Sequence, residues 1–357
     1  MNRPVLFVTN HAPAFRVGAF AALHAREDVV FALIGGDVRH GGDADEDAAL
    51  PFPVLRPAQH EVARLAASGR YRAVIAGLSG RVALPAAYAG ARRAGIPFVL
   101  WATIWAHPRT VAHAASYRPL RHLYRSADAV VTYGPHVSRY VRAQGSARPI
   151  LEAPQSIDDA FWTAPATPLR RAPFQVLFAG RLEHEKGVEV LLRAWGAAGL
   201  EPDEAALVLV GDGPLAHQAE RGTARLEGPR PATEVRDFYA GSDVVVVPSI
   251  PTRAFREPWG LVVNEAFDRG VPVIASTAVG AAAGGLVRHE ETGLVVPAGN
   301  PSALAAALRR LHGDPALRGR LGAAAREAVK AHSHAAWAAG MSRALAAAGA
   351  GAPEGRC

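Results

Sequence analysis

Cysteine and long apolar runs are nearly absent from this 357-residue chain. The only cysteine is the last residue, Cys357, so no intramolecular disulfide can form and the chain suits a reducing compartment. The apolar run from Val5 to Val8 is too short for the core of a signal peptide. No other run approaches the ~20 residues that span a bilayer. These absences predict a cytoplasmic protein.

Lysine is also scarce compared with arginine, and arginine supplies most of the formal net charge of +7. Such an excess favours anionic partners, which could be phosphates, anionic lipid or nucleic acid. Nucleic acid is disfavoured because the basic residues are scattered and no recognised binding module is present. With 50% hydrophobic and 20% charged residues, the composition is that of a globular protein with room for two cores.

Short β-branched runs alternate with alanine-rich helical patterns along the chain. Several runs are apolar almost throughout, as expected for strands covered on both faces. The alternation predicts an α/β fold of βαβ units with parallel sheets. We expect strands in VLFVTN, VVFALIGG, YRAVIAGLS, PFVLWAT, DAVVTYG and PILEAPQ, and then in QVLFAGR, ALVLVGDG, DVVVVPS, PVIAS and GLVVPAG.

A proline-rich segment between Asp158 and Phe174 interrupts this rhythm, and we interpret it as a linker. The prediction is therefore two Rossmann-like doubly wound domains that face each other across a cleft. Ligands of such sheets bind outside the carboxyl ends of the strands. The predicted divisions are a first domain at 1–158, the linker at 159–173, a second domain at 174–332, a helix at 333–349 that packs back on the first domain, and a tail at 350–357.

The segment QVLFAGRLEHEKGVEVL places two cations after a strand. The strand ends at Gly180, Arg181 and Lys186 lie in the turn, and a helix begins near Gly187. Cations beside the N-terminus of a helix favour an anion such as phosphate. The alternative is a solvated turn in which the cations pair with neighbouring glutamates.

The segment ALVLVGDGPLA has the G-x-G-x-x-A spacing of a dinucleotide-binding turn, with Gly211, Gly213 and Ala216. This spacing raises the alternative of an NAD-dependent oxidoreductase. However, Asp212 would oppose a pyrophosphate, and Pro214 removes an amide from the anion site. We favour a tight structural turn near a nucleotide.

The segment EPWGLVVNEA places two acids, Glu257 and Glu265, in a largely apolar stretch. We expect a helix from Pro258 to about Arg269, with Glu257 at its mouth and Glu265 two turns inside. A carboxylate in such a place needs hydrogen-bond donors. Sugar hydroxyls would supply them, and the alternative is an internal salt bridge with Arg253 or Arg256.

These motifs together resemble the retaining GT-B glycosyltransferases of family four, the glycosyl transferases group 1. The resemblance covers the second half of the chain and the two-domain layout, and the E-x7-E pair is its most specific part. The matching segments are GRLEHEKGVEVL, LVLVGDGP, EVRDFYAGSDVVVVPS, EPWGLVVNEAFDRGVPVIAS and HEETGLVVPAGN.

The resemblance implies a sugar nucleotide as donor substrate and a glycan, lipid-linked or small-molecule acceptor. It implies that Arg181 and Lys186 hold the diphosphate, that Glu265 binds the ribose, and that Glu257 acts at the transferring sugar. It also implies further contacts, at the mouth of the helix expected to begin at Pro258 and at the strand ends. These are the amides of Gly260, Leu261 and Val262 for the diphosphate, and Gly211, Gly213, Glu227 and Gly228 around the nucleotide.

The reaction implied by the resemblance retains the anomeric configuration. Fixed cations stabilise the charge that develops on a leaving nucleoside diphosphate. No D-x-D-type acidic cluster follows a strand, and the acidic run GGDADEDAAL is interpreted as a solvated turn. We therefore expect no metal and no cofactor. A catalytically silent nucleotide- or glycan-binding module is the alternative from another class.

In the first domain, Gly18 is expected to open a helix after the first strand, where the resemblance implies a backbone contact to the donor phosphate. Arg16 could add charge there or extend along the surface. His107 follows a strand where the resemblance implies a histidine that contacts the sugar, so it is a candidate catalytic residue, although a loop histidine is more often solvated. Asn10, His11 and Arg16 follow the first strand and are candidate acceptor or sugar contacts.

The segment SYRPLRHLYRSAD places Arg118, Arg121 and Arg125 at helical spacing between apolar residues. Such a helix could make a peripheral contact with anionic lipid on the inner face of the membrane. The alternative is one amphipathic surface helix with no membrane role.

Overall fold

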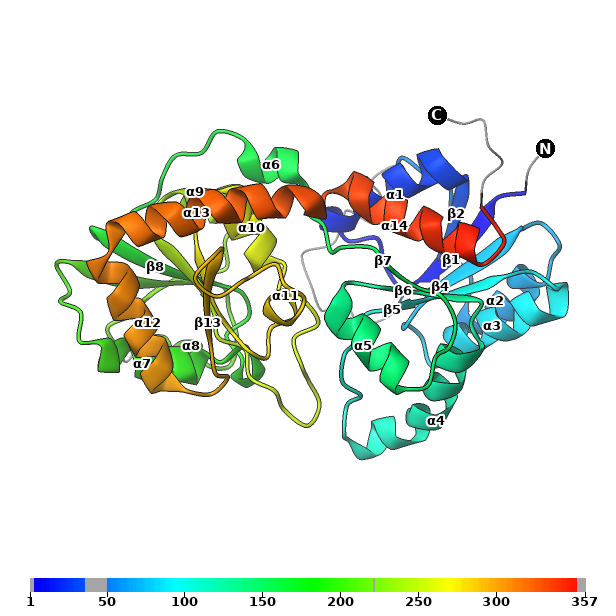
Figure 1. Ribbon diagram of the computed structural model, residues 1–357, viewed down its shortest axis with the longest axis horizontal. Helices are drawn as coiled ribbons and strands as arrows, with labels where there is room; N and C mark the ends of the chain where they lie inside the picture. The colour runs from blue at the N-terminus through cyan, green and yellow to red at the C-terminus, as the bar shows by residue number, and fades with distance from the viewer. Residues whose placement is uncertain (1–2, 36–49, 221, 352–357) are drawn as a thin grey trace. The chain divides into compact units, whose positions relative to one another are not determined.

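The structure is a computed structural model, and it describes residues 3–35, 50–220 and 222–351. It divides into two compact units (Figure 1). Unit 1 combines Met1–Asp158 with His332–Cys357, and unit 2 is Asp159–Ala331. Unit 1 is thus assembled from both ends of the chain, whereas unit 2 is continuous.

Unit 1 contains a seven-stranded parallel sheet in the order β3-β2-β1-β4-β5-β6-β7. Strand β1 therefore lies between β2 and β4. Strands β2 and β3 are added on one side of it and β4 to β7 on the other, so the strand order reverses at β1. The strands are β1 (Val5–Thr9), β2 (Val29–Leu33), β3 (Val54–Leu55), β4 (Ala73–Gly77), β5 (Phe98–Ala102), β6 (Ala129–Thr132) and β7 (Ile150–Glu152).

Unit 2 contains a six-stranded parallel sheet in the order β10-β9-β8-β11-β12-β13. Its first strand, β8, again marks the reversal and lies between β9 and β11. The strands are β8 (Phe174–Ala179), β9 (Ala205–Val210), β10 (Arg225–Gly228), β11 (Val244–Val247), β12 (Val273–Ser276) and β13 (Gly293–Val296).

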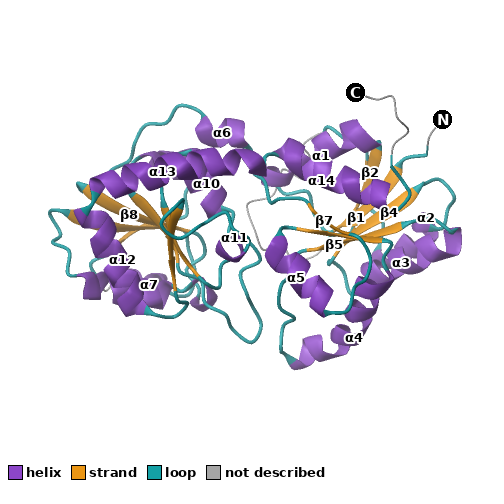
Figure 2. Ribbon diagram, viewed as in Figure 1, coloured by secondary structure: helices purple, strands orange, loops and turns teal. Residues whose placement is uncertain are grey.

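Helices cover both faces of each sheet (Figure 2). The helices of unit 1 are α1 (Ala14–Glu27), η1 (Gln59–Glu61), α2 (Val62–Ala66), α3 (Ala83–Ala94), α4 (Val111–Ser126), α5 (Pro135–Ala143) and α14 (His334–Ala347). Those that begin in unit 2 are α6 (Asp159–Thr163), η2 (His184–Lys186), α7 (Val188–Ala198), α8 (Ala216–Glu220), α9 (Ala232–Ala240), α10 (Val262–Asp268), α11 (Gly280–Ala283), α12 (Pro301–Gly313), α13 (Pro315–Val329) and η3 (Lys330–His332).

The apolar runs of the sequence form these strands because both faces of each sheet are covered. Strands β1, β4, β5 and β9 are buried at every residue. All eleven segments expected to be strands contain one. Two strands were not predicted: β3 has two residues, and β10 begins with the exposed Arg225 and lacks an apolar pattern. The α/β prediction with two doubly wound parallel sheets is confirmed.

Helix α14 packs on α1 and completes the core of unit 1. Trp337 is fully buried. Its ring stacks on that of Phe7, with centroids 6.4 Å apart, and lies 5.7 Å from the ring of Phe20. The His334 ring contacts the carbonyl oxygen of Phe15 at 3.2 Å. The last helix is therefore an integral part of the first domain's hydrophobic core.

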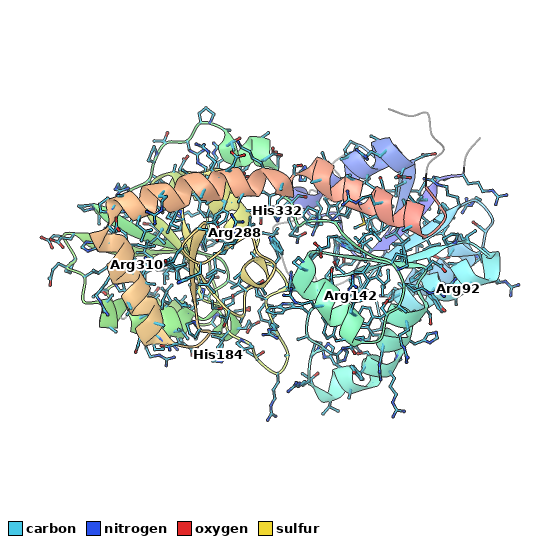
Figure 3. All side chains as sticks on the ribbon, viewed as in Figure 1. Arg92, Arg142, His184, Arg288, Arg310 and His332 are labelled. Carbon is cyan, nitrogen blue, oxygen red and sulfur yellow. The ribbon has the colours of Figure 1, made fainter. Side chains whose placement is uncertain are left out.

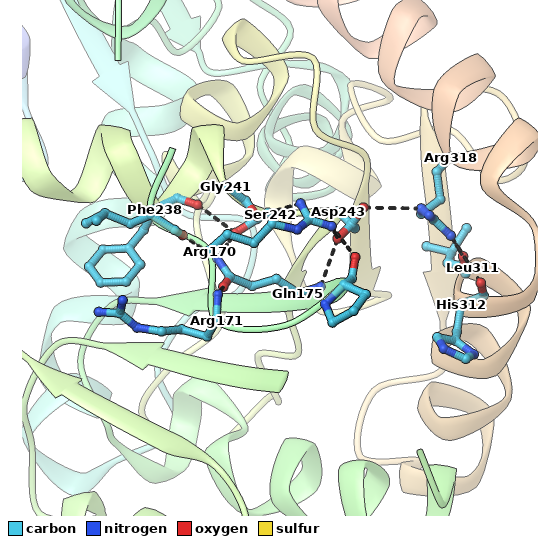
Figure 4. A network of polar contacts seen from close by, with 12 residues as sticks. Arg170, Arg171, Gln175, Phe238, Gly241, Ser242, Asp243, Leu311, His312 and Arg318 are labelled. Atoms are coloured by element: carbon cyan, nitrogen blue, oxygen red, sulfur yellow. Dashed lines mark hydrogen bonds and ion pairs between the residues drawn. The ribbon is translucent and has the colours of Figure 1, made fainter. Parts of the chain in front are cut away.

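The segment expected to be a linker is held against unit 2 (Figure 4). Arg170 donates to the carbonyl oxygen of Gly241 at 3.0 Å and to Asp243 Oδ2 at 2.6 Å. Gln175 donates to the carbonyl oxygen of Leu169 at 2.9 Å and to Ser242 Oγ at 3.2 Å. Because these hydrogen bonds join the segment to residues 241–243, residues 169–175 are fixed to unit 2.

Exposed arginines on both units pair locally with acids. Arg92 Nη1 lies 3.0 Å from Asp128 Oδ2, and Arg310 pairs with Glu290 (Figure 3). Such exposed pairs contribute little to stability, so the buried cores carry most of it. Among the described residues, no helix combines the length and apolar character that crossing a membrane requires.

Candidate functional site

The order of strands in unit 2 brings two loops together at the carboxyl end of the sheet. One follows β8 and carries Arg181 and Lys186, and the other follows β11. The Ile250 amide donates to the carbonyl oxygen of Glu185 at 3.0 Å, which joins the two loops. A Cβ at Gly187 would lie 2.1 Å from the carbonyl oxygen of Pro248, and its φ is 74°. Only glycine permits this close approach.

Lys186 and Glu257 meet at this junction. Lys186 Nζ lies 2.6 Å from Glu257 Oε2, and the Ser249 hydroxyl donates to the same oxygen at 3.0 Å. Both side chains are largely buried, with 15% and 6% of their surfaces exposed. One partner of Glu257 is thus a lysine from the neighbouring loop, which the sequence alternatives Arg253 and Arg256 did not include.

Arg181 lies in the same loop and pairs with local acids. Its Nη1 is 2.6 Å from Glu183 Oε1, and its Nη2 is 4.0 Å from Glu185 Oε1. Burial raises the pKa of Glu183, while Arg181 and Lys186 act in the opposite direction. The pairing expected for a solvated turn is therefore present at Arg181, and Glu183 links Arg181 electrostatically to Lys186.

Glu265 lies on α10 and accepts a hydrogen bond from the Tyr239 hydroxyl at 2.7 Å. Burial raises the pKa of Glu265 to about 7, and the hydrogen bond from Tyr239 lowers it by a smaller amount. The carboxylate therefore changes its ionisation near neutral pH, which is unusual for a glutamate.

The helix that carries Glu265 begins later than predicted. Helix α10 starts at Val262, not at Pro258, because Gly260 has a φ of 94° and turns the backbone out of helical conformation. Glu257 instead forms an isolated bridge with Val279. The prediction of a helix over 258–269 was wrong at its start. Gly260, Leu261 and Val262 precede or open α10, where amides have no partner four residues earlier.

The Gly-Asp-Gly turn after β9 packs against the loop after β8. A Cβ at Gly211 would lie 2.0 Å from the carbonyl oxygen of Gly180, and one at Gly213 would lie 2.6 Å from that of Leu182. Asp212 accepts from the Gly213 amide at 2.7 Å. The following helix α8 has five residues. These contacts account for both glycines by backbone packing, as favoured from sequence.

Glu227 and Gly228 lie on β10 beside this turn. The Gly211 amide donates to the carbonyl oxygen of Gly228 at 2.9 Å. Glu227 pairs with Arg171 at 2.8 Å and with Arg230 at 3.3 Å, and these cations hold its pKa below the ordinary value. The four residues expected near the nucleotide are thus brought together, with the Glu227 carboxylate engaged by arginines.

In unit 1, the loops after β1 and β4 also meet at the carboxyl end of the sheet. The Ser79 hydroxyl donates to Asn10 Oδ1 at 3.2 Å. Asn10 and His11 therefore lie at the reversal of that sheet, where α/β proteins place ligands.

His107 contacts the start of α4. Its Nε2 lies 2.8 Å from the carbonyl oxygen of His113, and its ring packs edge-on against Tyr117 at 5.1 Å. One ring nitrogen is thus engaged by backbone, and the ring is not simply solvated.

Gly18 lies inside α1 and does not open it, because the helix begins at Ala14. As its fifth residue, Gly18 has a helical partner for its amide and cannot offer that amide to a phosphate. A Cβ at Gly18 would lie 2.3 Å from His334 Nδ1, so glycine is required for packing against α14. The prediction of a backbone phosphate contact from Gly18 is corrected accordingly.

Arg16 is buried, with 4% of its surface exposed, so the surface position, one of the two alternatives considered from sequence, was wrong. Its guanidinium lies 5.1 Å from the Trp101 ring, 5.6 Å from Tyr133 and 5.8 Å from Trp337. It donates to the Tyr133 hydroxyl at 3.2 Å and to Gln155. Burial lowers its pKa, and no carboxylate of the described residues pairs with it.

The helix expected to carry the basic face is present as α4. Arg118, Arg121 and Arg125 are exposed, as is Tyr117, and Arg121 donates to the carbonyl oxygen of Gln144 at 3.2 Å. The acidic run GGDADEDAAL falls mainly on residues 36–49 and lies outside the described residues. Among the described residues, no three His, Cys, Asp or Glu side chains are grouped to hold a metal ion.

Two residues of this site were not singled out from sequence. Ser249 follows β11 directly, so the rule that placed the other residues at strand ends would have found it. Tyr239 lies on α9 inside a segment that matched the family, but its contact with Glu265 depends on tertiary packing and has no local signal.

Two Rossmann-like units with charged side chains at the strand ends define the GT-B class, and solved structures with this fold are similar to the chain. The Anabaena protein HepE, solved in complex with UDP, superposes with a TM-score of 0.75 at 19% identity, covering 96% of this chain and 99% of that one. Sucrose-phosphate synthase from Thermosynechococcus elongatus gives 0.73 at 21% identity, covering 96% and 98%.

Residues 173–314 match the family model of glycosyl transferases group 1. A lipopolysaccharide core biosynthesis glycosyltransferase of Rhizobium meliloti is 34% identical over 241 residues, which are 61% of this chain and 66% of that protein. A D-inositol 3-phosphate glycosyltransferase of Corynebacterium glutamicum is 38% identical over 184 residues, which are 47% and 42%. The chain thus spans two thirds or less of these relatives. The match of residues 173–314 to glycosyl transferases group 1 confirms the resemblance for the second unit.

Proposed function

We propose that the protein is a sugar-nucleotide-dependent glycosyltransferase and that the strand ends of unit 2 bind its donor. The observation that carries this proposal is the meeting of Lys186 and Glu257 at the reversal of the sheet, with Arg181 in the same loop. Open α/β sheets bind ligands at this position. The family whose model unit 2 matches supports the same conclusion.

In the proposed complex, the donor diphosphate lies against Lys186 and Arg181. An ammonium that already faces a carboxylate gains a second anionic partner when the diphosphate arrives, while Glu257 is left to accept from sugar hydroxyls. The bond between the anomeric carbon and the phosphate oxygen then breaks, and its electron pair stays on the nucleoside diphosphate. The acceptor hydroxyl oxygen bonds to the anomeric carbon, and its proton passes to the departing phosphate oxygen. Fixed cations stabilise that developing charge more than they stabilise the ground state.

The finer points of the reaction are also proposals. Transfer proceeds with retention of configuration and without a metal, because two cations from the chain already face the leaving group. Glu265 accepts from the ribose hydroxyls, and residues near Gly211 and Gly228 surround the base. The acceptor is a glycan, a lipid-linked sugar or a small molecule, and Asn10 and His11 of unit 1 contact it.

Uridine nucleotides are the first donors to test, because HepE was solved with UDP-glucose and with UDP. Calorimetric titration with UDP, GDP and NAD tests the donor class, and a hydrolysis screen of sugar nucleotides tests turnover. We expect UDP or GDP to bind and NAD not to bind. Binding of NAD alone would favour the oxidoreductase alternative, and binding without turnover of any sugar nucleotide would favour a silent module.

A substitution test must respect the ion pair. Lys186→Ala leaves the buried Glu257 carboxylate without its cation, which costs about 3 to 5 kcal/mol. The double variant Lys186→Met with Glu257→Gln avoids a buried unpaired charge and keeps the shape of both side chains. We expect it to fold and to lose turnover. Near-normal turnover in this folded variant would show that the diphosphate lies elsewhere.

Metal independence is tested by chelation. We expect turnover to be unchanged after treatment with EDTA and dialysis, because the cations that face the leaving group are side chains. A loss of turnover that Mg²⁺ or Mn²⁺ restores would contradict this part of the proposal.

Peripheral membrane contact through Arg118, Arg121 and Arg125 is a further part of the proposal. Vesicle flotation with phosphatidylglycerol at low salt tests it, with neutral vesicles as the control. Absence of binding to both would remove the membrane role.

A further inference from the structure

Tyr239 connects the expected ribose-binding carboxylate to the beginning of unit 2. It is the penultimate residue of α9 and is fully buried. Its hydroxyl donates to Glu265 Oε2 at 2.7 Å. The other carboxylate oxygen accepts no hydrogen bond from the described residues. A buried phenol that serves one oxygen fixes the orientation of the carboxylate and leaves its second oxygen for another donor.

The ring of Tyr239 packs on Trp162 of α6, with ring centroids 5.6 Å apart and planes at 81°. Helix α6 begins at Asp159, where the chain enters unit 2. The same helix is held by two arginines. Arg269 donates to the carbonyl oxygens of Trp162 and Ala164 at 3.1 and 2.8 Å, and Arg236 donates to that of Phe161 at 3.2 Å.

The three elements form one continuous arrangement. Helix α9 supplies the hydroxyl and Arg236, helix α10 supplies Glu265 and ends just before Arg269, and α6 supplies the ring that supports Tyr239. Edge-on aromatic contacts and hydrogen bonds to main-chain oxygens both restrict rotation of the groups they join. The position of the Glu265 carboxylate therefore depends on α6 through the tyrosine ring.

Other charged groups also surround α10. Asp268 lies one turn beyond Glu265, and burial raises its pKa to about 7. Asp159 of α6 and Arg326 of α13 act on Asp268 in opposite directions. Helix α9 contributes Arg236 and Asp237, and the strands β11 and β12 contribute no charge. Any pH dependence at this helix includes Asp268, so a test must isolate the contribution of the Tyr239 hydroxyl.

We propose that Tyr239 is a positioning residue for donor binding: its hydroxyl holds Glu265 in the orientation that accepts the ribose hydroxyls, and its ring makes α6 part of that arrangement. This inference rests on the proposed function of the site. It assigns a role in donor binding to a residue that does not itself contact the nucleotide.

The test is calorimetric titration of the full chain with UDP at pH 6.5 and pH 8.5. The variants are Tyr239→Phe, which removes the hydroxyl alone, and Tyr71→Phe, which removes the hydroxyl of a tyrosine in unit 1 that is 3% exposed and serves as a control. If loss of the hydroxyl raises the proton affinity of Glu265 about tenfold, the affinity for UDP falls about eightfold at pH 6.5 and less than about twofold at pH 8.5. Tyr71→Phe matches the wild type at both.

The pH dependence separates positioning from a general structural effect, because a distorted site would weaken binding equally at both pH values. Trp162→Leu provides a second variant that keeps the hydroxyl and the carboxylate. We expect it to weaken UDP binding more at pH 6.5 than at pH 8.5, as Tyr239→Phe does, since a ring without this support no longer holds its hydroxyl on Glu265. If Tyr239→Phe does not fold, this variant alone decides whether α6 supports the site.

The outcomes distinguish the two proposals. If the wild type binds none of UDP, GDP and NAD, the proposed function fails. If the wild type binds UDP but Tyr239→Phe binds equally well at pH 6.5, or Trp162→Leu has no effect, the positioning role is wrong and the donor site stands.

Discussion

Glu265 is expected to destabilise the fold at neutral and alkaline pH, and Glu265→Gln should relieve this. Burial raises its pKa from 4.5 to about 7. A shift of this size corresponds to about 3 kcal/mol as an upper limit. The unfolded chain ionises near pH 4.5, whereas the folded chain holds the proton until about pH 7. Stability therefore falls as pH rises between these values and stays low above them.

Glutamine keeps the shape of the side chain and still accepts from the Tyr239 hydroxyl, but it carries no charge. We expect Glu265→Gln to unfold at higher denaturant concentration than the wild type at pH 8.5, by up to about 3 kcal/mol. Near pH 4.5 the two proteins should be nearly equal. Chemical denaturation of the full chain, followed by the fluorescence of its tryptophans, measures both differences.

Asp268 supplies the control for this experiment, because its pKa is also raised to about 7 and it lies on the same helix. Asp268→Asn should relieve its own contribution and leave that of Glu265. If Glu265→Gln is no more stable than the wild type at pH 8.5, the carboxylate is not desolvated as described. Glu265→Gln should also bind UDP more weakly. The carboxylate would then favour donor binding while it lowers the stability of the fold.

Three further outcomes follow from packing and charge. Gly211→Ala should destabilise the fold by more than about 2 kcal/mol, because its Cβ would lie 2.0 Å from a backbone oxygen. Gly196→Ala has open space around its Cβ and should stabilise helix α7 by about 0.5 to 1 kcal/mol. Thermal unfolding of both variants measures the two changes. Arg16→Met should change the free energy of unfolding by less than about 1 kcal/mol, because a buried cation without a carboxylate gains little. A loss above about 3 kcal/mol would show that its aromatic contacts stabilise the fold. Glu257→Gln alone should retain the fold and weaken UDP binding less than Lys186→Met, as competitive titration would measure.

The fold could be predicted from sequence because its strands are apolar runs of β-branched residues. Short apolar runs such as DVVVVPS and ALVLVGDG, separated by helical patterns, are typical of buried parallel strands. The two missed strands show the limit of this approach. Strand β10 reads Arg-Leu-Glu-Gly, and its position depends on pairing with β9 and not on its own composition.

The site was predictable where its residues follow strands. Lys186 and Glu257 were both placed at the carboxyl end of the sheet by local reasoning, but their pairing was not foreseen. It depends on the order of strands, which sets β8 beside β11. Gly18 shows the opposite case, since its role in packing against His334 comes from a helix more than 300 residues away in the sequence.

The discontinuous make-up of unit 1 has a consequence for biosynthesis. Helix α14 supplies Trp337 to a core that otherwise consists of residues from the first half of the chain. A ribosome therefore completes unit 2 before it delivers the last piece of unit 1. The part of the chain made first is the part finished last, and until then Phe7 and Phe20 lack their contacts with Trp337 and are a natural place for a chaperone to bind.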